Sequence, residues 1–127
     1  MNDATTLELG LRRTVGAAVD EVWEYFVVDG LATWLGDTTL PLHKGEKYLT
    51  TDGVAGSVLS RTDQLRLRIT WQPDDWDHDS TLQVTLMPSG EGTTIGFHQD
   101  GFASPAERSQ MLAHWSSVLD EIEDDLS

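Results

Sequence analysis

Cysteine is absent from the 127-residue sequence, which excludes disulfide bonds and thiolate chemistry. Long apolar runs are absent as well, so no segment predicts a helix that crosses a bilayer. The polar start at residues 1–6 has neither the basic nor the apolar region of a secretory signal. We therefore expect a cytoplasmic protein.

Basic residues are scarce. The chain has 8 lysines and arginines against 22 aspartates and glutamates, which gives a formal net charge of −14. Such a charge repels phosphate backbones and anionic lipid surfaces. We expect no nucleic acid and no membrane partner, and we interpret the acidity as a source of solubility.

The motifs of several common active sites are also missing. There is no Gly-x-Ser-x-Gly elbow, and Ile95 stands where a dinucleotide fingerprint beginning at Gly90 would need a glycine. The acidic loop 74–79 alternates carboxylates like the start of a calcium loop. However, Ser80 replaces the turn glycine, and Met87 replaces the bidentate glutamate. We interpret this loop as solvated acidic surface.

The histidines have no ligand partner at a metal-binding spacing on a common element. They are His43, His78, His98 and His114. We therefore predict no metal, no cofactor and surface positions for these side chains.

The size and hydrophobic content of the chain fit one domain. With 127 residues, 39% of them hydrophobic, the chain can bury a single sizeable core. We predict one domain over residues 1–127.

The C-terminal stretch Ser104–Leu126 predicts a long helix. Ser104 can accept a hydrogen bond from the N–H of Glu107 while the Glu107 carboxylate reaches back, and Pro105 fits the first helical position. Apolar residues recur at three- and four-residue spacing, which places them on one face: Met111, Leu112, Trp115, Val118, Leu119, Ile122 and Leu126.

The rest of the chain predicts strands and two short helices. Residues 7–13 alternate as a half-buried strand does, and two short helical patterns follow, at 19–26 and 31–35. Further strands are expected at 47–51, 56–60, 65–72, 81–86 and 93–100, the last two joined by a turn at 88–92. Apolar residues fall on one side of these strands, so a single helical layer satisfies the sheet. We predict an α+β fold in which a curved antiparallel sheet wraps around the terminal helix.

The order of these features resembles the helix-grip domains of the START and birch-pollen-allergen-like (SRPBCC) superfamily. The branch is the one named for homology to the activator of the heat-shock protein 90 ATPase. The marks that carry the resemblance are Val22-Trp23, Trp34, Gly56, Val58, the segments 66–71 and 84–93, Gly101-Phe102 and Trp115. The resemblance implies a hydrophobic cavity between sheet and terminal helix, but it does not choose among ligand binders, polyketide cyclases and co-chaperones.

The sequence departs from the family pattern at three places. Gln99 stands where family members often carry an inward histidine, with His98 displaced to the outward side. His114 replaces the usual glycine before the helix tryptophan. Where family members commonly have a pair of glycines in the second strand, this sequence has Gly45 alone. A family acid or base is therefore not expected at position 99.

Aromatic and polar side chains are expected to converge on the cavity. The candidate ligand-binding residues are Trp34, Trp71, Gln99, Met111, Trp115 and Leu119. They would provide aromatic walls and one buried amide that needs hydrogen-bond partners, although ordinary core packing would also account for them.

Three hypotheses about function follow. The first is binding of a small hydrophobic or amphipathic molecule. The second is a co-chaperone-like module acting on a heat-shock protein 90 type ATPase, with that chaperone as the partner. The third is a cyclase- or dehydratase-like enzyme, for which Asp100, His98 or Glu46 would have to point into the cavity because Gln99 cannot titrate.

Overall fold

The computed structural model describes residues 7–126. In chain order the elements are β1 (Glu8–Val15), α1 (Val19–Glu24), the π-helical turn η2 (Tyr25–Asp29), α2 (Leu31–Trp34), β2 (Lys47–Leu49), β3 (Ala55–Thr62), β4 (Arg66–Trp71), β5 (Ser80–Ser89), β6 (Gly92–Asp100) and α3 (Pro105–Leu126).

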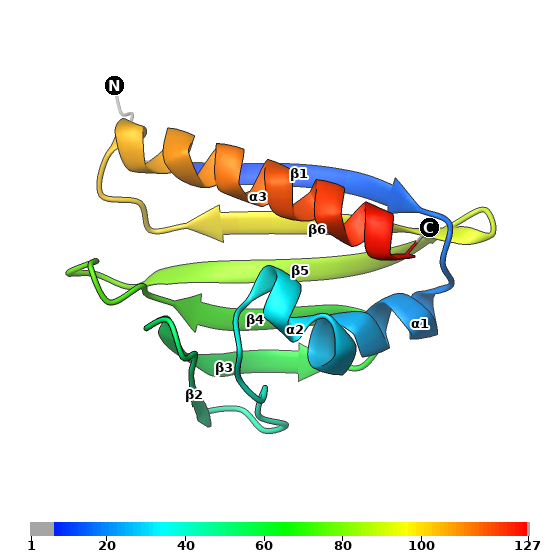
Figure 1. Ribbon diagram of the computed structural model, residues 1–127, viewed down its shortest axis with the longest axis horizontal. Coiled ribbons are helices and arrows are strands. Elements are labelled where there is room, and N and C mark those ends of the chain that lie inside the picture. The colour runs from blue at the N-terminus through cyan, green and yellow to red at the C-terminus, as the bar shows by residue number, and fades with distance from the viewer. Residues whose placement is uncertain (1–6, 127) are drawn as a thin grey trace.

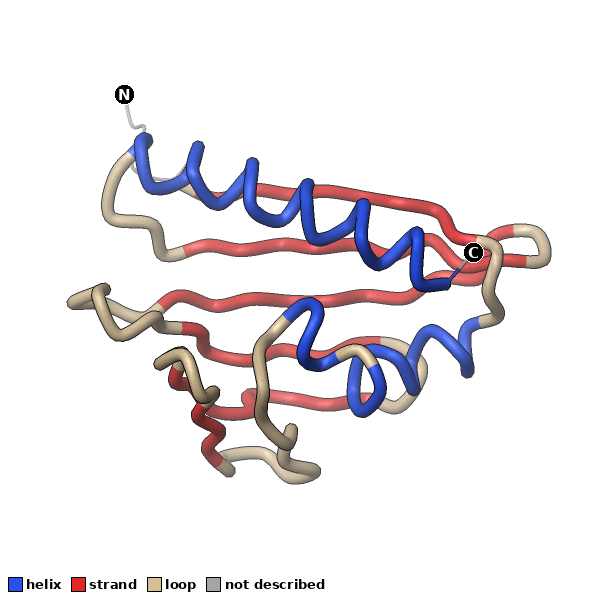
Figure 2. Tube along the Cα trace, viewed as in Figure 1, coloured by secondary structure: helices blue, strands red, loops and turns tan. Residues whose placement is uncertain are grey.

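The strands form one antiparallel sheet in the order β1-β6-β5-β4-β3-β2. All the helices lie on one face of this sheet (Figure 1). α3 runs along β1 and β6, and α2 lies over the strands on the other side of β5 (Figures 1 and 2). α1 contacts β5 and β6. The predicted α+β helix-grip fold is therefore confirmed. Among residues 7–126, no helix is both long enough and apolar enough to span a membrane.

The strands bury alternate residues, as their sequence pattern predicts. In β6, for example, Thr93, Ile95, Phe97 and Gln99 are buried while the residues between them are partly exposed. Alternation places successive side chains on opposite faces, so one face of the sheet packs against the helices and the other faces solvent.

The capping of α3 is close to that predicted from its sequence. The N–H of Glu107 donates to Ser104 Oγ at 3.1 Å, and the Glu107 carboxylate accepts from the N–H of Ala103 at 2.9 Å. Further along the helix, Arg13 of β1 donates to Asp120 at 2.7 Å and to Glu123 at 2.9 Å. These contacts fix both the start of α3 and its position against the edge of the sheet.

Some element boundaries differ from those predicted. The first helix does not end near Phe26 but continues as the π-helical turn η2. The hairpin turn is shorter than residues 88–92, because Pro88 still lies in β5 opposite Thr93 of β6. Leu65 lies outside β4 and is exposed, since that strand begins at Arg66.

Candidate functional site

Aromatic rings packed in tilted and edge-to-face pairs fill the space between the sheet and α3. The ring centroid of Trp115 lies 5.3 Å from that of Phe97 and 5.5 Å from that of Trp71. Phe97 in turn lies 5.9 Å from Phe26 and 6.2 Å from Trp34. These distances are those of packed aromatic pairs. The deepest part of the predicted cavity is therefore occupied by the protein's own side chains.

Gln99 is fully buried, and protein groups supply its hydrogen bonds. Its Oε1 accepts from Trp115 Nε1 at 2.6 Å, and its Nε2 donates to Ser80 Oγ at 3.0 Å. Ser80 Oγ then donates to the carbonyl oxygen of Trp71 at 2.7 Å. This chain of hydrogen bonds links α3 to β6, β5 and β4. Gln99 thus fastens the helix to the sheet without needing a ligand to satisfy its amide.

An open hollow lies at the mouth of the space between α2, the sheet and α3. Its volume is about 440 Å³. The lining residues come from α2 and its end (Ala32, Thr33, Trp34, Leu35, Gly36), the turn before β3 (Asp52, Val54), β4 (Trp71) and α3 (Gln110, Met111, His114). Three of the six predicted site residues therefore line one hollow, which we call the mouth hollow. The other three, Gln99, Trp115 and Leu119, are almost completely buried and do not line it.

The turn that closes one side of the mouth hollow is held by its own hydrogen bonds. The hydroxyl of Thr50 donates to Asp52 Oδ1 at 2.5 Å and accepts from the N–H of Val54 at 2.9 Å. Gly36 has a φ of +141°, and a Cβ there would crowd the side chain of Thr50. Only glycine fits this position without strain, so the close approach of the end of α2 to this turn requires Gly36.

One polar atom of the mouth residues has no partner. Trp71 Nε1 is buried, and no hydrogen-bond acceptor for it occurs within residues 7–126. A buried donor without an acceptor costs about 1 to 3 kcal/mol of stability. Such groups are rare in folded proteins and merit an explanation in each case.

Two titratable groups line the mouth hollow, and the sequence reasoning did not select either. One is Asp52 and the other is His114. Much of His114 is exposed, yet its imidazole lies 4.6 Å from the ring of Trp115, and desolvation by the surrounding protein lowers its pKa. The signal that could have revealed His114 was its position one turn of helix from Met111 and Gln110.

The residues that would have favoured an enzyme lie elsewhere. His98 Nε2 forms a 2.8 Å hydrogen bond with Glu8 on the solvent-facing side of the sheet, and Asp100 is paired with Glu8 in the same register. Glu46 is exposed and bonds the ring of His43 at 3.1 Å. None of the three proposed acid–base residues lines the mouth hollow.

The acidic loop packs onto the start of α3 through His78. The ring of His78 stacks on Trp76 at 4.8 Å, and its Nε2 is 2.8 Å from Glu107 Oε1. In the described part of the chain, no three histidine, aspartate or glutamate side chains gather closely enough to hold a metal ion.

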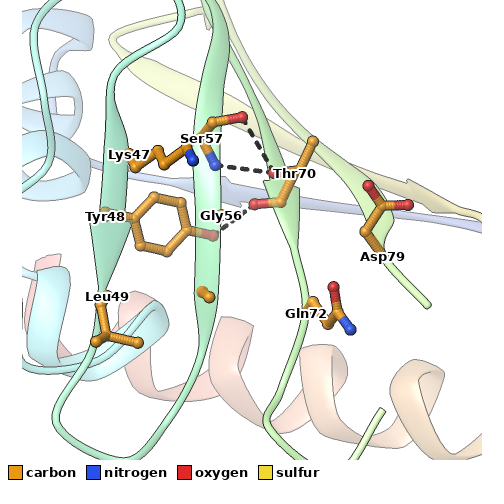
Figure 3. A pocket seen from close by; sticks show the side chains of 9 residues that line it. Lys47, Tyr48, Leu49, Gly56, Ser57, Thr70, Gln72 and Asp79 are labelled. Carbon is orange, nitrogen blue, oxygen red and sulfur yellow. Dashed lines mark hydrogen bonds between the residues drawn. The ribbon is translucent and has the colours of Figure 1, made fainter. Parts of the chain in front are cut away.

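A larger hollow, of about 630 Å³, lies at the β2 edge of the sheet. Figure 3 shows Tyr48 reaching across Gly56 toward Thr70, whose carbonyl oxygen accepts from the phenol at 2.6 Å. A Cβ on Gly56 would collide with that carbonyl and with the ring, so glycine is required here. Burial raises the pKa of Tyr48, which keeps the phenol protonated as a donor. Ser57, on the neighbouring strand, also bonds Thr70. Because these contacts join β2, β3 and β4, we regard this hollow as a feature of strand packing.

Comparison with known proteins places this geometry in a family. The family model described as "Activator of Hsp90 ATPase homolog 1-like protein" matches residues 16–127. No curated protein sequence shows a significant match to the chain.

Several solved structures share the fold. CalU16 from Micromonospora echinospora superposes with a TM-score of 0.78 at 23% identity, covering 89% of this chain and 71% of that one. DynU16, from the dynemicin biosynthetic locus, superposes with a TM-score of 0.81 at 22% identity. The match covers 93% of this chain and 46% of DynU16, so this chain spans about half the length of that protein. PFC0360w, an HSP90 activator from Plasmodium falciparum, superposes with a TM-score of 0.80 at 14% identity, covering 94% of this chain and 96% of that one.

At these identities the structural likenesses establish the fold and not a shared activity. The family model, however, covers nearly the whole chain from residue 16 onward. The chain therefore belongs to the family of activator of Hsp90 ATPase homolog 1-like proteins, within the helix-grip superfamily.

Proposed function

We propose that this protein binds a small apolar or amphipathic molecule in the mouth hollow. The proposal rests on Trp71, which lines this hollow and whose buried indole nitrogen has no acceptor among residues 7–126. A volume of about 440 Å³ lies within the range usual for ligand pockets. A bound molecule with a carbonyl or ether oxygen would supply the acceptor after a small rotation of the indole.

The lining residues divide into an apolar wall and a polar rim. Trp34, Trp71 and Met111 would contact the apolar part of the ligand, while Asp52 and His114 would face its polar end. No lysine or arginine lines the hollow, so a neutral or cationic polar end fits better than a carboxylate. Gln99, Trp115 and Leu119 would act beneath the ligand by holding the wall in place rather than by touching it.

The proposal can be tested by filling the hollow. A panel of neutral aromatic, polyketide-like and fatty-acid compounds would be screened by melting temperature and tryptophan fluorescence. Binding raises the melting temperature by mass action. Met111→Trp should abolish the shift while changing the stability of the free protein little, because the new ring occupies open space. Ala113→Trp, which adds the same ring on an exposed part of α3 outside the hollow, should leave the shift intact.

The opposite pattern would show that the mouth residues are ordinary core. It would consist of no melting shift with any compound, together with a destabilisation of about 1 to 3 kcal/mol by Met111→Trp, as overpacking produces.

A second candidate function is a co-chaperone-like interaction with an Hsp90-type ATPase. Its support is the family model, which matches residues 16–127. Purified protein at tens of micromolar should then stimulate the ATPase of an Hsp90 homologue, and an unchanged rate would count against this candidate. Met111→Trp separates the two functions, since it should block small-molecule binding without affecting a protein contact made elsewhere on the surface.

A further inference from the structure

The solvent-facing side of the sheet carries an unusual charge distribution. The strand registers align outward residues in rows across β1, β6, β5 and β4. One row contains Arg12, Gly96, Thr85 and Arg66, and the adjacent row contains Gly10, His98, Gln83 and Arg68. We call these two rows the outer face. None of the helices in residues 7–126 covers it, because they all lie on the opposite side of the sheet (Figure 1).

Within the described part of the chain, the three arginines of the outer face have no acidic partner. Arg12, Arg66 and Arg68 are exposed, and none forms an ion pair within residues 7–126. The two rows contain no carboxylate, although the chain carries 22 acidic residues against 8 basic ones. Glu8 lies one row further along β1 and is engaged by His98 at 2.8 Å. The outer face is thus a locally cationic surface on a strongly acidic protein.

Two glycines leave a hollow beside these arginines. Its volume is about 430 Å³, and it lies between Gly10 and Gly96 with Arg12, Thr85 and His98 at its border. Glycine weakens the interior of a strand, so its presence usually has a reason. Neither glycine has a positive φ, and the β1–β6 register is continuous without a bulge. The nearest atom to a Cβ on Gly10 would be the Phe97 carbonyl oxygen at 3.9 Å, so crowding does not require glycine there either.

We propose that the outer face is a docking surface for a short acidic segment of a partner protein. The carboxylates of the segment would pair with Arg12 and Arg66, whose guanidinium groups bind carboxylates in a bidentate manner. An apolar or aromatic side chain between those carboxylates would enter the hollow at Gly10 and Gly96. Glycine at a strand interior commonly marks the close approach of a ligand or another chain, which is the role required here.

Charge complementarity favours a short segment over an extended polyanion. Electrostatic interactions at physiological salt are screened beyond about 8 Å, so the arginines act on whatever lies directly over them. A nucleic acid or a lipid surface would extend past the outer face and meet Glu8, Asp100 and the surrounding acidic surface. A short segment would contact the arginines alone.

The test uses the full chain and a defined probe. A fluorescein-labelled, N-acetylated and C-amidated peptide of sequence Gly-Asp-Glu-Trp-Glu-Asp-Gly would be titrated by anisotropy at about 50 mM and about 300 mM NaCl. We expect saturable binding that weakens at least about fivefold at the higher salt. Arg12→Gln with Arg66→Gln should weaken it by at least about fivefold. Lys44→Gln with Lys47→Gln, which changes the net charge equally at exposed sites outside the outer face, should stay within about twofold of the wild type.

A second variant tests the hollow separately. Gly10→Thr adds a side chain into open space, so the melting temperature should stay the same or rise, while peptide affinity should fall at least about fivefold. Gly16→Thr, at a position with no atom near its Cβ, controls for the added residue and should leave affinity unchanged.

Three results would overturn the proposal. One is the absence of saturable peptide binding at low salt, and another is an equal loss of affinity in the lysine control. The third is a different occupant: tighter binding of single-stranded DNA or anionic vesicles than of the peptide, or a concentration-dependent dimer in sedimentation that Arg12→Gln with Arg66→Gln abolishes.

Discussion

At the scale of single residues, the indole of Trp115 is the donor that begins the hydrogen-bond chain through Gln99 and Ser80 to the backbone of β4. All three side chains are almost fully buried. In such surroundings each group depends on the next, because a member that loses its partner cannot turn to water instead.

Replacing Trp115 with phenylalanine should therefore destabilise the protein by more than the loss of ring volume alone. The Gln99 oxygen would lose its donor, at a cost of about 1 to 3 kcal/mol. Urea denaturation would measure the change. The double variant with Gln99→Met should cost less than the sum of the two single variants, since it removes both members of the pair. Strict additivity would show that the two residues act independently.

His78 is a second residue whose contribution depends on its partners. Its ring lies 3.1 Å from Asp77 and 2.8 Å from Glu107. The hydrogen bond to Asp77, with that to Glu107, raises the pKa of His78 above its ordinary value of 6.5. The protonated ring therefore joins the acidic loop to the capping residue of α3.

This arrangement predicts a pH-dependent stability. Because the folded-state pKa of His78 is raised, its contribution is fully present below pH 6.5 and is lost as the pH rises through the folded-state pKa. The difference in melting temperature between wild type and His78→Gln should be largest near pH 5.5 and should shrink by about pH 9. A difference that does not change across this range would contradict a role for the charged ring.

At the scale of elements, the π-helical turn η2 decides how the helical layer closes. The phenol of Tyr25 donates to Asp125 Oδ2 at 2.7 Å, which ties η2 to the end of α3. Burial raises the pKa of Tyr25 to about 12, so the phenol stays protonated and able to donate. Gly30 follows η2, and its Cα lies directly against the Tyr25 ring.

Gly30→Ala should disturb this contact. The new Cβ would collide with the ring of Tyr25 and push the phenol away from Asp125. We expect a loss of about 1 to 3 kcal/mol, as overpacking of a buried contact produces. Gly16→Ala is the matched control, because nothing lies within 4 Å of a Cβ there. Equal melting temperatures for the two variants would show that η2 tolerates the shift.

At the scale of the whole molecule, the net charge of −14 opposes compactness. Few ion pairs offset it, and the pairs of Arg13 with Asp120 and Glu123 lie at the partly exposed edge of the sheet. Repulsion among the many carboxylates should therefore dominate the response of stability to salt.

The melting temperature should rise by several degrees as NaCl increases from about 20 to about 300 mM, because screening weakens the repulsion more than it weakens these few pairs. Scanning calorimetry would measure the shift, and KCl should act in the same way as NaCl. A fall in melting temperature with salt would mean that the ion pairs outweigh the repulsion.

The sequence alone was enough for the architecture. Local signals predict the elements: the period of two in the strands, the helical spacing from Met111 to Leu126 and the cap at Ser104. Such patterns are sufficient because secondary structure follows local backbone geometry. The order of the elements then identified the family and placed Trp34, Trp71 and Met111 near one another. The sequence could not reveal that η2 is a π-helical turn, because the apolar spacing of residues 19–26 fits an ordinary helix equally well.

What the tertiary structure decided was the difference between core and site. From the sequence, Gln99 was expected to be a buried amide whose hydrogen-bond partners a ligand could supply. In the structure Trp115 and Ser80, which are distant in sequence, supply them. Trp71 carried no such signal, and its indole nitrogen is the one of these groups left without a described partner. Hydrogen-bond satisfaction and open volume depend on side chains brought together from separate elements, so no local pattern can determine them. The same reason explains why the grouping of Arg12, Arg66 and Arg68 on the outer face emerged only when the strands were in place.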